Sequence, residues 1–504
     1  MSAINKLGRN PRRLGSAMAI GNAMLNLLTH LILTPALLSG LAEEGYSFYK
    51  VIQSLAGPLI LLRLGLSTVT AGAGARYRAN PTGETLREKE NAFTLSVLIS
   101  GAMALAVVLL GFAMTSLVPK LFGGYSLRQI ADGKALLAVL AVATALHILS
   151  DTLTGSARGR EHFVFLQGCV AAHHLLRTAL LCFIARRGGP VWQLGLADLG
   201  LYALLLAVNG LYCLWAGEML RLHRPSRREL GAIGAFAAAL FLQGAISQVN
   251  ANLDTVILGA AGESPEVITL YSSALTVYTA YCALTASLPG IFLPGAARLT
   301  AEGAGSRELT DFVLSPGRVQ TMLCLWVLGA FALFGGDFIR LWIGEKYLAA
   351  HPLALFLMAC GTVPLAQSLC QSLLDAKLKR LFQSMVLLGM AAANLALSLL
   401  WVKPLGYWGP ALATGLTLVL GQGVLMNGYY AHTLGLDIPR LLRGLFRSTL
   451  PAAAGACLLC LPLTGLSGGW LVFLGKCGIF SAVYGLFLWK GVMLWKPKKP
   501  NRPC

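Results

Sequence analysis

The stretch ARYRANPTGETLREKENAFTLSVLISGAMALAVVLLGF (75–112) sets a basic gap directly before a long apolar run. The basic residues of the gap are Arg76, Arg78, Arg87 and Lys89. The run behind them is about 20 residues long, which is enough to cross a hydrocarbon core. Because lysine and arginine beside a span resist translocation, the gap is expected on the cytoplasmic side of a membrane. The stretch therefore predicts a membrane-spanning helix together with its orientation.

Lysine and arginine follow this pattern along the whole chain. About 26 of the 40 lie in one alternating set of gaps between apolar runs, and about 8 lie in the other set. Lys120, Arg128 and Lys134 are the main exceptions in the poorer set. The asymmetry predicts an even number of spans with both termini in the cytoplasm. It indicates a multi-pass protein of the cell (inner, cytoplasmic) membrane.

The composition agrees with this interpretation. The chain has 504 residues, of which 56% are hydrophobic and 12% charged, whereas ordinary soluble domains are about 25% charged. The net charge of +19 is spread over many short flanks, which favours anionic inner-leaflet lipid over nucleic acid as the partner. The apolar run behind Lys6 and Arg9 is too long for a cleaved signal peptide, so a signal anchor is expected.

The predicted fold is an all-α polytopic membrane protein with about fourteen transmembrane helices. The helices are the apolar runs, and the segments between them, alternately rich and poor in lysine and arginine, mark where each helix ends. The helices are expected near 14–37, 47–71, 92–117, 135–157, 162–185, 193–217, 231–257, 265–296, 311–334, 349–374, 381–402, 408–430, 446–465 and 470–492.

Two similar halves are predicted within this order. The segments GAGARYRA (72–79) and PGAARLTA (294–301) each close the second helix of a half. The arginine behind an alanine lies equally far after a tyrosine in both, after Tyr49 and after Tyr271. Duplicated halves are common in transporters, so we expect two pseudo-symmetric six-helix lobes, a basic linker and two appended helices with a basic tail. The predicted bounds of these four parts are 1–217, 218–230, 231–432 and 433–504.

The sequence lacks the motifs of an ATP-driven motor, a zinc protease and a nucleotide-binding enzyme. There is no GxxxxGK[ST], HExxH or nucleotide-binding fingerprint, and no inner loop exceeds about 20 residues, too few for a catalytic domain. Cys457 and Cys460 form a CxxC inside an apolar helix, which is typical of buried structural cysteine. No catalytic residue, cofactor or metal ligand is predicted.

Polar residues inside the first two spans are candidates for function, because charge there is costly. Asn22, Asn26 and His30 recur every four residues, either as a cavity wall or as interhelical hydrogen-bonding groups. Lys50 lies near the outer end of the second helix, within reach of the interface. Arg63 lies deeper, where it meets either an anion in a cavity or an acidic side chain of a neighbouring helix.

The fourth and fifth predicted helices carry a second set of polar residues. His147 and Asp151 are four residues apart on one face, as a proton-relay pair or as a structural contact. His173 and His174 lie one turn before Arg177. Arg177 is the second candidate for an anion contact.

The seventh predicted helix carries polar residues on a single face, namely Gln243, Ser247, Asn250 and Asp254. A face this polar does not point at lipid, so it borders a water-filled cavity or another helix. Asp254 is a candidate for ion coupling. Because cations lead among the mid-span charges of the chain, an anionic cargo is the simplest interpretation.

Several stretches carry a family resemblance through their order and spacing. They are LRLGLSTVTAGAGARYRAN (62–80), NLDTVILGAAGESPEVITLYSSA (252–274), FLPGAARLTAEG (292–303), FIRLWIGEKYLAAHPL (338–353), GYWGPALATGL (406–416) and TLGLDIPRLL (433–442). With them the chain resembles the polysaccharide flippases of the multidrug/oligosaccharidyl-lipid/polysaccharide exporter superfamily, which move undecaprenyl-diphosphate-linked repeat units.

The resemblance implies a fourteen-helix fold in two six-helix lobes that rock around an inner cationic cavity. It also implies mid-membrane basic residues against the diphosphate, for which Arg63 on the second helix is the nearest match by position. The first helix departs from the lipid II flippase branch, because it has Asn22, Asn26 and His30 where that branch has arginines. This departure argues against a peptidoglycan precursor as the cargo.

Together these observations predict a flippase that carries a lipid-linked oligosaccharide from the inner to the outer leaflet by alternating access, for cell-surface polysaccharide synthesis. The predicted substrate-binding residues are Arg63 and Arg177 for phosphate charge, with Lys50, Asn22, Asn26, His30, Gln243 and Asn250. The predicted ion-coupling residues, for Na⁺ or H⁺, are Asp254, His147 and Asp151. A monomer is expected, with glycosyltransferases and a glycan polymerase as partners. A drug or cation antiporter of the same superfamily and a membrane-embedded glycan polymerase or ligase are the alternatives.

The charge pattern makes a topology prediction. Reporter fusions at Gly83 and Ser226 should report the cytoplasm, and fusions at Glu44 and Gly262 should report the outside, because only the first two lie in strongly basic gaps. Paired alkaline phosphatase and fluorescent-protein fusions measure this. An outside signal at Ser226 would contradict the assignment of the two halves.

Overall fold

The structure is a computed structural model that describes residues 11–63, 65–122, 125–218, 220–221, 253–283, 299, 305–376 and 381–493. These residues form helices, turns and short connections, with no strand among them. Ten of the described helices are long and apolar enough to cross a membrane. The chain is thus an all-α multi-pass membrane protein, and the described helices agree with the predicted order of about fourteen spans.

The chain divides into two compact units, Met1–Thr269 and Leu270–Cys504. The predicted linker at 218–230 lies mostly outside the described residues, so the predicted lobe bounds stay a prediction. The elements of unit 1 are α2 (Pro11–Ala56), η1 (Gly57–Arg63), α3 (Leu66–Ala79), α4 (Gly83–Met114), η2 (Thr115–Leu117), α5 (Val118–Leu121), α6 (Leu127–Gly159), α7 (Phe163–Arg186), α8 (Trp192–Trp215) and a helical stretch at 253–260.

Unit 2 begins inside α10 (Pro265–Ala283). Two stretches near its end are π-helical. Its further elements are α12 (Ser306–Ile343), η3 (Glu345–Tyr347), α13 (Ala350–Ala366), α14 (Cys370–Ala376), α15 (Leu381–Leu405), α16 (Trp408–Thr417), η4 (Leu418–Leu425), α17 (Met426–Tyr429), η5 (Tyr430–Leu434), α18 (Ile438–Phe446), α19 (Thr449–Cys460), η6 (Leu461–Gly465) and α20 (Trp470–Met493).

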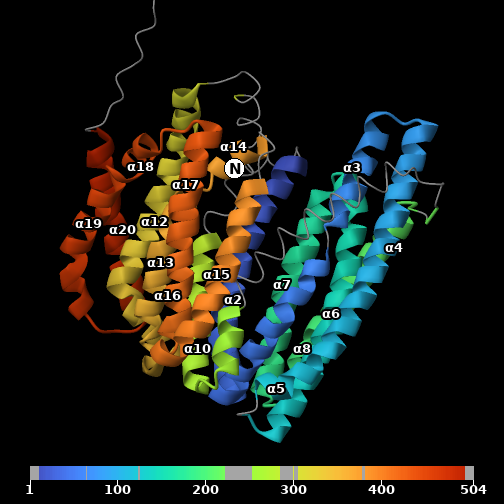
Figure 1. Cartoon of the computed structure of the whole chain (residues 1–504), viewed down its shortest axis with the longest axis horizontal. Helices are drawn as coiled ribbons and strands as arrows, with labels where there is room; N and C mark the ends of the chain where they lie inside the picture. Colours follow the sequence, from blue (N-terminus) through green and yellow to red (C-terminus); the bar gives the residue numbers. More distant parts are fainter. Residues whose placement is uncertain are drawn as a thin grey trace, which may run out of the picture. The chain divides into compact units, whose positions relative to one another are not determined.

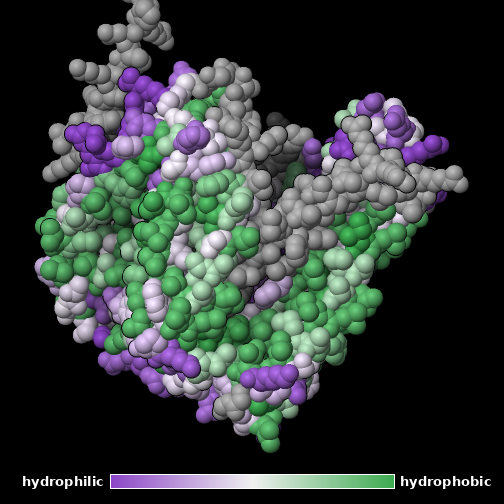
Figure 2. All heavy atoms as spheres, in the orientation of Figure 1, coloured by the Kyte–Doolittle hydropathy of each residue, from purple (hydrophilic) through white to green (hydrophobic). Residues whose placement is uncertain are grey.

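Within unit 1, α2 packs along α7, and α6 packs against α3, α4 and α8 (Figure 1). Apolar side chains cover the middle of the helices on the visible face of each unit, while polar side chains gather toward the helix ends (Figure 2). This distribution is expected of helices whose middle is surrounded by hydrocarbon. α4 and α6 each begin with a capping box, formed by Thr82 with Thr85 and by Ser126 with Gln129.

The first two predicted spans are joined in a way the sequence analysis did not anticipate. They form the continuous helix α2, interrupted only at Ala42, whose φ of 57° and ψ of 173° are non-helical. Within the second span the α-helix ends at Ala56 and is followed by the 3₁₀ helix η1, which begins at Gly57, beside Pro58, and ends at Arg63. A left-handed Gly65, with φ 58°, precedes α3. The α-helical geometry is thus interrupted near Pro58 and Gly65, because proline supplies no N–H and glycine adopts positive φ without strain.

A close approach of backbones holds α3 against α6. A Cβ on Gly155 would lie 2.7 Å from the Ser67 carbonyl oxygen, and one on Gly159 would lie 3.1 Å from the Ala71 carbonyl oxygen. Small residues four apart allow helices to pack this closely in membranes, where dispersion contacts replace the hydrophobic effect. The segment that follows Arg63 is therefore anchored to α6.

Unit 2 keeps its last two helices by packing and by one buried charge pair. α19 and α20 contact α12 (Figure 1), and their shared core includes Phe334 and Phe480. Lys476 of α20, with 3% of its side chain exposed, lies 2.7 Å from the Asp337 carboxylate of α12. A buried cation needs such a partner, so this pair positions α20 on α12.

The α3–α6 contact can be tested by filling it. Gly155→Val should lower the thermal stability of the detergent-solubilised protein by about 1–3 kcal/mol, the usual cost of overpacking, because backbone atoms cannot yield to the new side chain. Gly168→Val on α7 is the matched control, since a Cβ there meets nothing within 4 Å. Equal melting temperatures for the two variants would contradict the close packing.

Candidate functional site

Arg63 is the last residue of η1, directly before the break in the second span. Its side chain is 45% exposed. The first N–H groups of a helix generally lack acceptors within it and carry partial positive charge, and α3 starts directly behind the break without a side-chain cap. A cation and a positive helix end therefore lie at one point of the chain.

The α3–α6 contact brings Arg63 to a carboxylate. The Nε atom of Arg63 lies 3.9 Å from Oδ2 of Asp151, which is one turn before Gly155 on α6. The Ser67 hydroxyl of α3 donates a hydrogen bond of 3.3 Å to the same oxygen. Arg63 and Ser67 thus both contact Asp151. This is the acidic side chain of a neighbouring helix that the sequence analysis offered as one alternative for Arg63.

Arg177 lies in a different environment. Its Nε and Nη2 atoms donate to the two oxygens of Asp198 on α8, at 2.5 and 3.0 Å. Only 17% of the Arg177 side chain and 7% of the Asp198 side chain are exposed. This is a bidentate, largely desolvated pair whose charges compensate each other.

A stack of rings lies between the two charge pairs. The His147 ring stacks on Tyr202 of α8 with 4.4 Å between centroids, and His173 of α7 stacks on the same tyrosine at 5.0 Å. The fields of Arg63, Asp151 and Asp198 act on His147. The stack joins α6, α7 and α8. The ring of His147 contacts Tyr202, whereas Asp151 contacts Ser67 and Arg63 and lies 3.9 Å from Arg158 at the end of α6. The predicted His147–Asp151 relay therefore stays a prediction.

The polar residues Asn22, Asn26 and His30 of α2 lie in two kinds of environment. The Asn22 amide nitrogen donates to the Gln167 backbone oxygen and to its side-chain oxygen, both at 2.8 Å, so Asn22 bonds α2 to α7. Asn26 is half-buried and His30 is exposed. Further along α2, the Lys50 ammonium lies 5.6 Å from the centroid of the Tyr46 ring. Asn22 therefore bonds two helices together, whereas Asn26 and His30 keep part of their surface accessible.

The polar face of the seventh helix is described only at its end. Gln243 and Asn250, like Ser247, lie outside the described residues. Asp254 lies in the helical stretch 253–260 and is 3% exposed. Among the described residues, no three His, Cys, Asp or Glu side chains are grouped to hold a metal ion.

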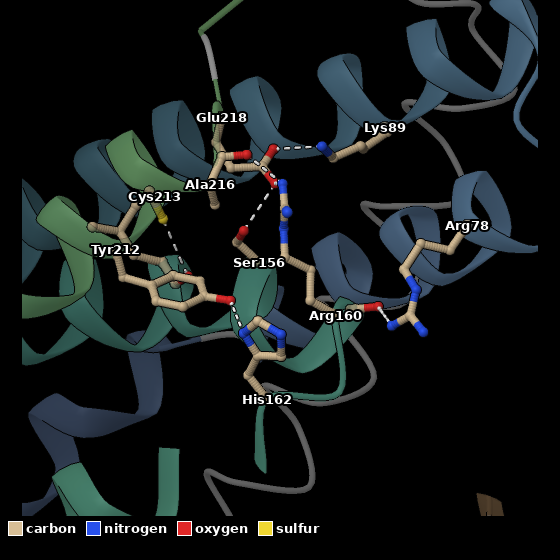
Figure 3. A network of polar contacts seen from close by, with 11 residues as sticks. Arg78, Lys89, Ser156, Arg160, His162, Tyr212, Cys213, Ala216 and Glu218 are labelled. Carbon is tan, nitrogen blue, oxygen red and sulfur yellow. Dashed lines mark hydrogen bonds and ion pairs between the residues drawn. The ribbon is translucent and has the colours of Figure 1, made fainter. Parts of the chain in front are cut away.

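A second polar network lies where α8 ends (Figure 3). The Glu218 carboxylate accepts from Lys89 of α4 at 2.9 Å, from the Ser156 hydroxyl of α6 at 2.8 Å and from Arg160 at 3.5 Å. Arg160 also donates to the Ala216 carbonyl. Glu218 thus fastens α4, α6 and α8 to one another at the end that the charge pattern places in the cytoplasm.

Several of these residues were not predicted from the sequence. Asp198 is an acidic residue inside an apolar span, LGLADLGLY (194–202), and the cost of buried charge could have identified it. Tyr202 follows it by one turn. Glu218 and Arg158 lie in basic inner gaps, where nothing in the sequence distinguishes them from solvated charges.

Comparison with solved structures identifies the fold, which the chain shares with a lipid II flippase and with a MATE transporter. The lipid II flippase MurJ, in an inward closed conformation, matches with a TM-score of 0.71 at 14% identity, over 96% of this chain and 100% of MurJ. A multidrug-resistance MATE family transporter of the MOP superfamily, in an inward-facing conformation, matches with a TM-score of 0.65 at 14% identity, over 84% of this chain and 99% of the transporter.

A likeness also exists at the level of sequence. The chain is 22% identical to the uncharacterized membrane protein EpsK of Bacillus subtilis (strain 168) over 455 residues, which is 87% of this chain and 86% of EpsK. No family model matches the chain.

The Arg177–Asp198 pair should stabilise unit 1. Asp198→Asn leaves a desolvated guanidinium without its counter-charge, which typically costs about 3–5 kcal/mol, so the melting temperature in detergent should fall clearly. Asp132→Asn, at a half-buried position near the start of α6, is the control and should change little. Replacing both partners by leucine should recover much of the stability, and a double variant as unstable as Asp198→Asn would contradict a simple pair.

Proposed function

We propose that the protein is a flippase that moves a polyprenyl-diphosphate-linked oligosaccharide from the inner to the outer leaflet of the cytoplasmic membrane, with Arg63 as a contact for the diphosphate. One observation carries the proposal. Arg63 is 45% exposed and loosely paired at 3.9 Å, whereas Arg177 is bidentately paired at 2.5 and 3.0 Å. Arg63 therefore keeps N–H donors for an incoming anion.

The break before α3 supports this role. In transporters, interrupted helices direct the positive ends of half-helices toward anionic groups of the substrate. Here Gly65 ends the interruption and α3 starts directly behind it, so the positive end of α3 adds to the field of Arg63. In a medium of low dielectric this combination attracts phosphate more strongly than either group would alone.

The other residues have supporting roles in the proposal. Arg177, neutralised by Asp198, holds α7 and α8 in place around the ring stack. His30, Asn26 and Lys50 are the contacts that α2 offers to sugar hydroxyls and phosphate, and Asn22 fixes α2 on α7. The carrier works as a monomer by alternating access, with glycosyltransferases that build the cargo and a polymerase that uses it. Coupling to Na⁺ or H⁺ is assigned to Asp254 and His147.

A drug or cation antiporter is the second candidate. The likeness to a MATE transporter and the carboxylates of Asp151 and Asp198 favour it, because an organic cation needs negative charge at its site. Asp198, however, is occupied by Arg177, and Asp151 has Arg63 beside it. Uptake of a cationic dye into proteoliposomes under a proton or sodium gradient distinguishes the two functions.

Arg63 provides the decisive test. In proteoliposomes with a fluorescent polyprenyl-diphosphate oligosaccharide, Arg63→Ala should reduce flipping by about 10- to 100-fold, the value of one or two hydrogen bonds to a charged group. Arg63→Lys should keep part of the activity, since charge attracts phosphate before bidentate geometry does. Arg76→Ala is the matched control, because Arg76 is exposed and pairs with Glu88. Normal flipping by Arg63→Ala would refute the proposed contact.

A further inference from the structure

The Asp151 carboxylate lies between two arginines. Its Oδ2 atom is 3.9 Å from Nε of Arg63, and its Oδ1 atom is 3.9 Å from Nη2 of Arg158. Arg158 lies seven residues after Asp151 on α6, two turns along the same face. One carboxylate thus brings together a cation of the broken second span and a cation at the end of α6.

Both contacts are long for a salt bridge. At 3.9 Å they hold by Coulomb attraction but exceed hydrogen-bond distance. The short bond of Asp151 is to the Ser67 hydroxyl, at 3.3 Å. By contrast, Asp198 binds Arg177 at 2.5 and 3.0 Å. The two arginines at Asp151 are therefore attracted to the carboxylate without being bound by it.

The exposure of the three side chains is unequal. Arg63 is 45% exposed and Arg158 47%, while Asp151 is 14% exposed. The carboxylate is largely buried, and the two guanidinium groups, with five N–H donors each, are exposed. The two arginines and the one carboxylate together carry a net charge of +1, and the exposed part of this charge is on the arginines.

We propose that Arg63 and Arg158 form a two-arginine clamp for a diphosphate, and that Asp151 is the internal counter-ion that the diphosphate displaces. This inference rests on the proposed function and adds to it a second phosphate contact and a release device. A diphosphate carries charge on two adjacent phosphate groups, and each group takes one guanidinium in a bidentate contact. A monophosphate engages only one arginine fully.

Asp151 then sets how tightly the cargo is held. While the clamp is empty, the carboxylate keeps the two guanidinium groups near each other and limits their repulsion. When the diphosphate arrives, it competes with Asp151 for both arginines, so part of the binding free energy is spent on displacing the carboxylate. This competition weakens the complex and lets the carrier release its cargo on the far side.

The test uses the full chain in detergent and two probes, farnesyl diphosphate and farnesyl monophosphate, with binding followed by thermophoresis. Arg158→Gln should weaken diphosphate binding about tenfold, the value of a hydrogen bond to a charged group, and change monophosphate binding little. Arg158→Lys should restore part of the difference. Arg76→Gln, a paired arginine on α3, is the matched control and should leave both affinities unchanged.

Asp151→Asn tests the counter-ion. It should tighten diphosphate binding about two- to fivefold, the value of a half-exposed ion pair, and slow release of the probe. Ser67→Ala, which keeps the carboxylate, should not tighten binding, and the melting temperature of each variant shows that it is folded. Weaker binding by folded Asp151→Asn, or equal losses of both probes in Arg158→Gln, would overturn the inference.

The same measurements separate this inference from the proposed function. If Arg63→Ala binds both probes like the unchanged protein, the phosphate contact of the proposed function fails. If Arg63→Ala loses both probes while Arg158→Gln binds like the unchanged protein, the proposed function stands and the two-arginine clamp fails.

Discussion

The backbone contact between α3 and α6 at Gly155 is the constraint on which the candidate site depends. Because no side chain separates the helices there, Ser67 and the break that precedes α3 are brought against α6. That contact sets Arg63 beside Asp151, although the two are 88 residues apart in the chain (151 minus 63). A larger residue at Gly155 would move the start of α3 and, with it, the cation that the proposed function needs.

The two arginines of unit 1 show how the surroundings decide what a charge does. Arg177 is desolvated, and its Nε and Nη2 atoms donate to the two carboxylate oxygens of Asp198. Its charge is therefore compensated without a ligand. Arg63 is half-exposed and meets Asp151 only at long range. The first kind of arginine stabilises helix packing, and the second has donors for a ligand. The difference lies in geometry and not in residue type.

The ring stack links these two pairs into one body. Tyr202 contacts His147 of α6 and His173 of α7, and Asp198 lies one turn before it on α8. At the far end of α8, Glu218 ties the same helix to α4 and α6 (Figure 3). In unit 1, α8 is therefore held by hydrogen bonds, ion pairs and ring contacts in addition to apolar packing. This is expected in a membrane, where lipid provides no hydrophobic force between helices.

The sequence by itself determined that the protein is an all-α multi-pass membrane protein and in what order its helices follow, and it marked Arg63 as a charge within an apolar stretch. These follow from local quantities, namely the length of apolar runs and the placement of lysine and arginine, which act on each span separately. It also placed Asn22 and Arg177 among polar residues within spans, but it left open whether such residues face a ligand or another helix. Only the tertiary structure decided that, because the partners Gln167 and Asp198 lie on other helices, and no periodicity within one helix reports what packs against it.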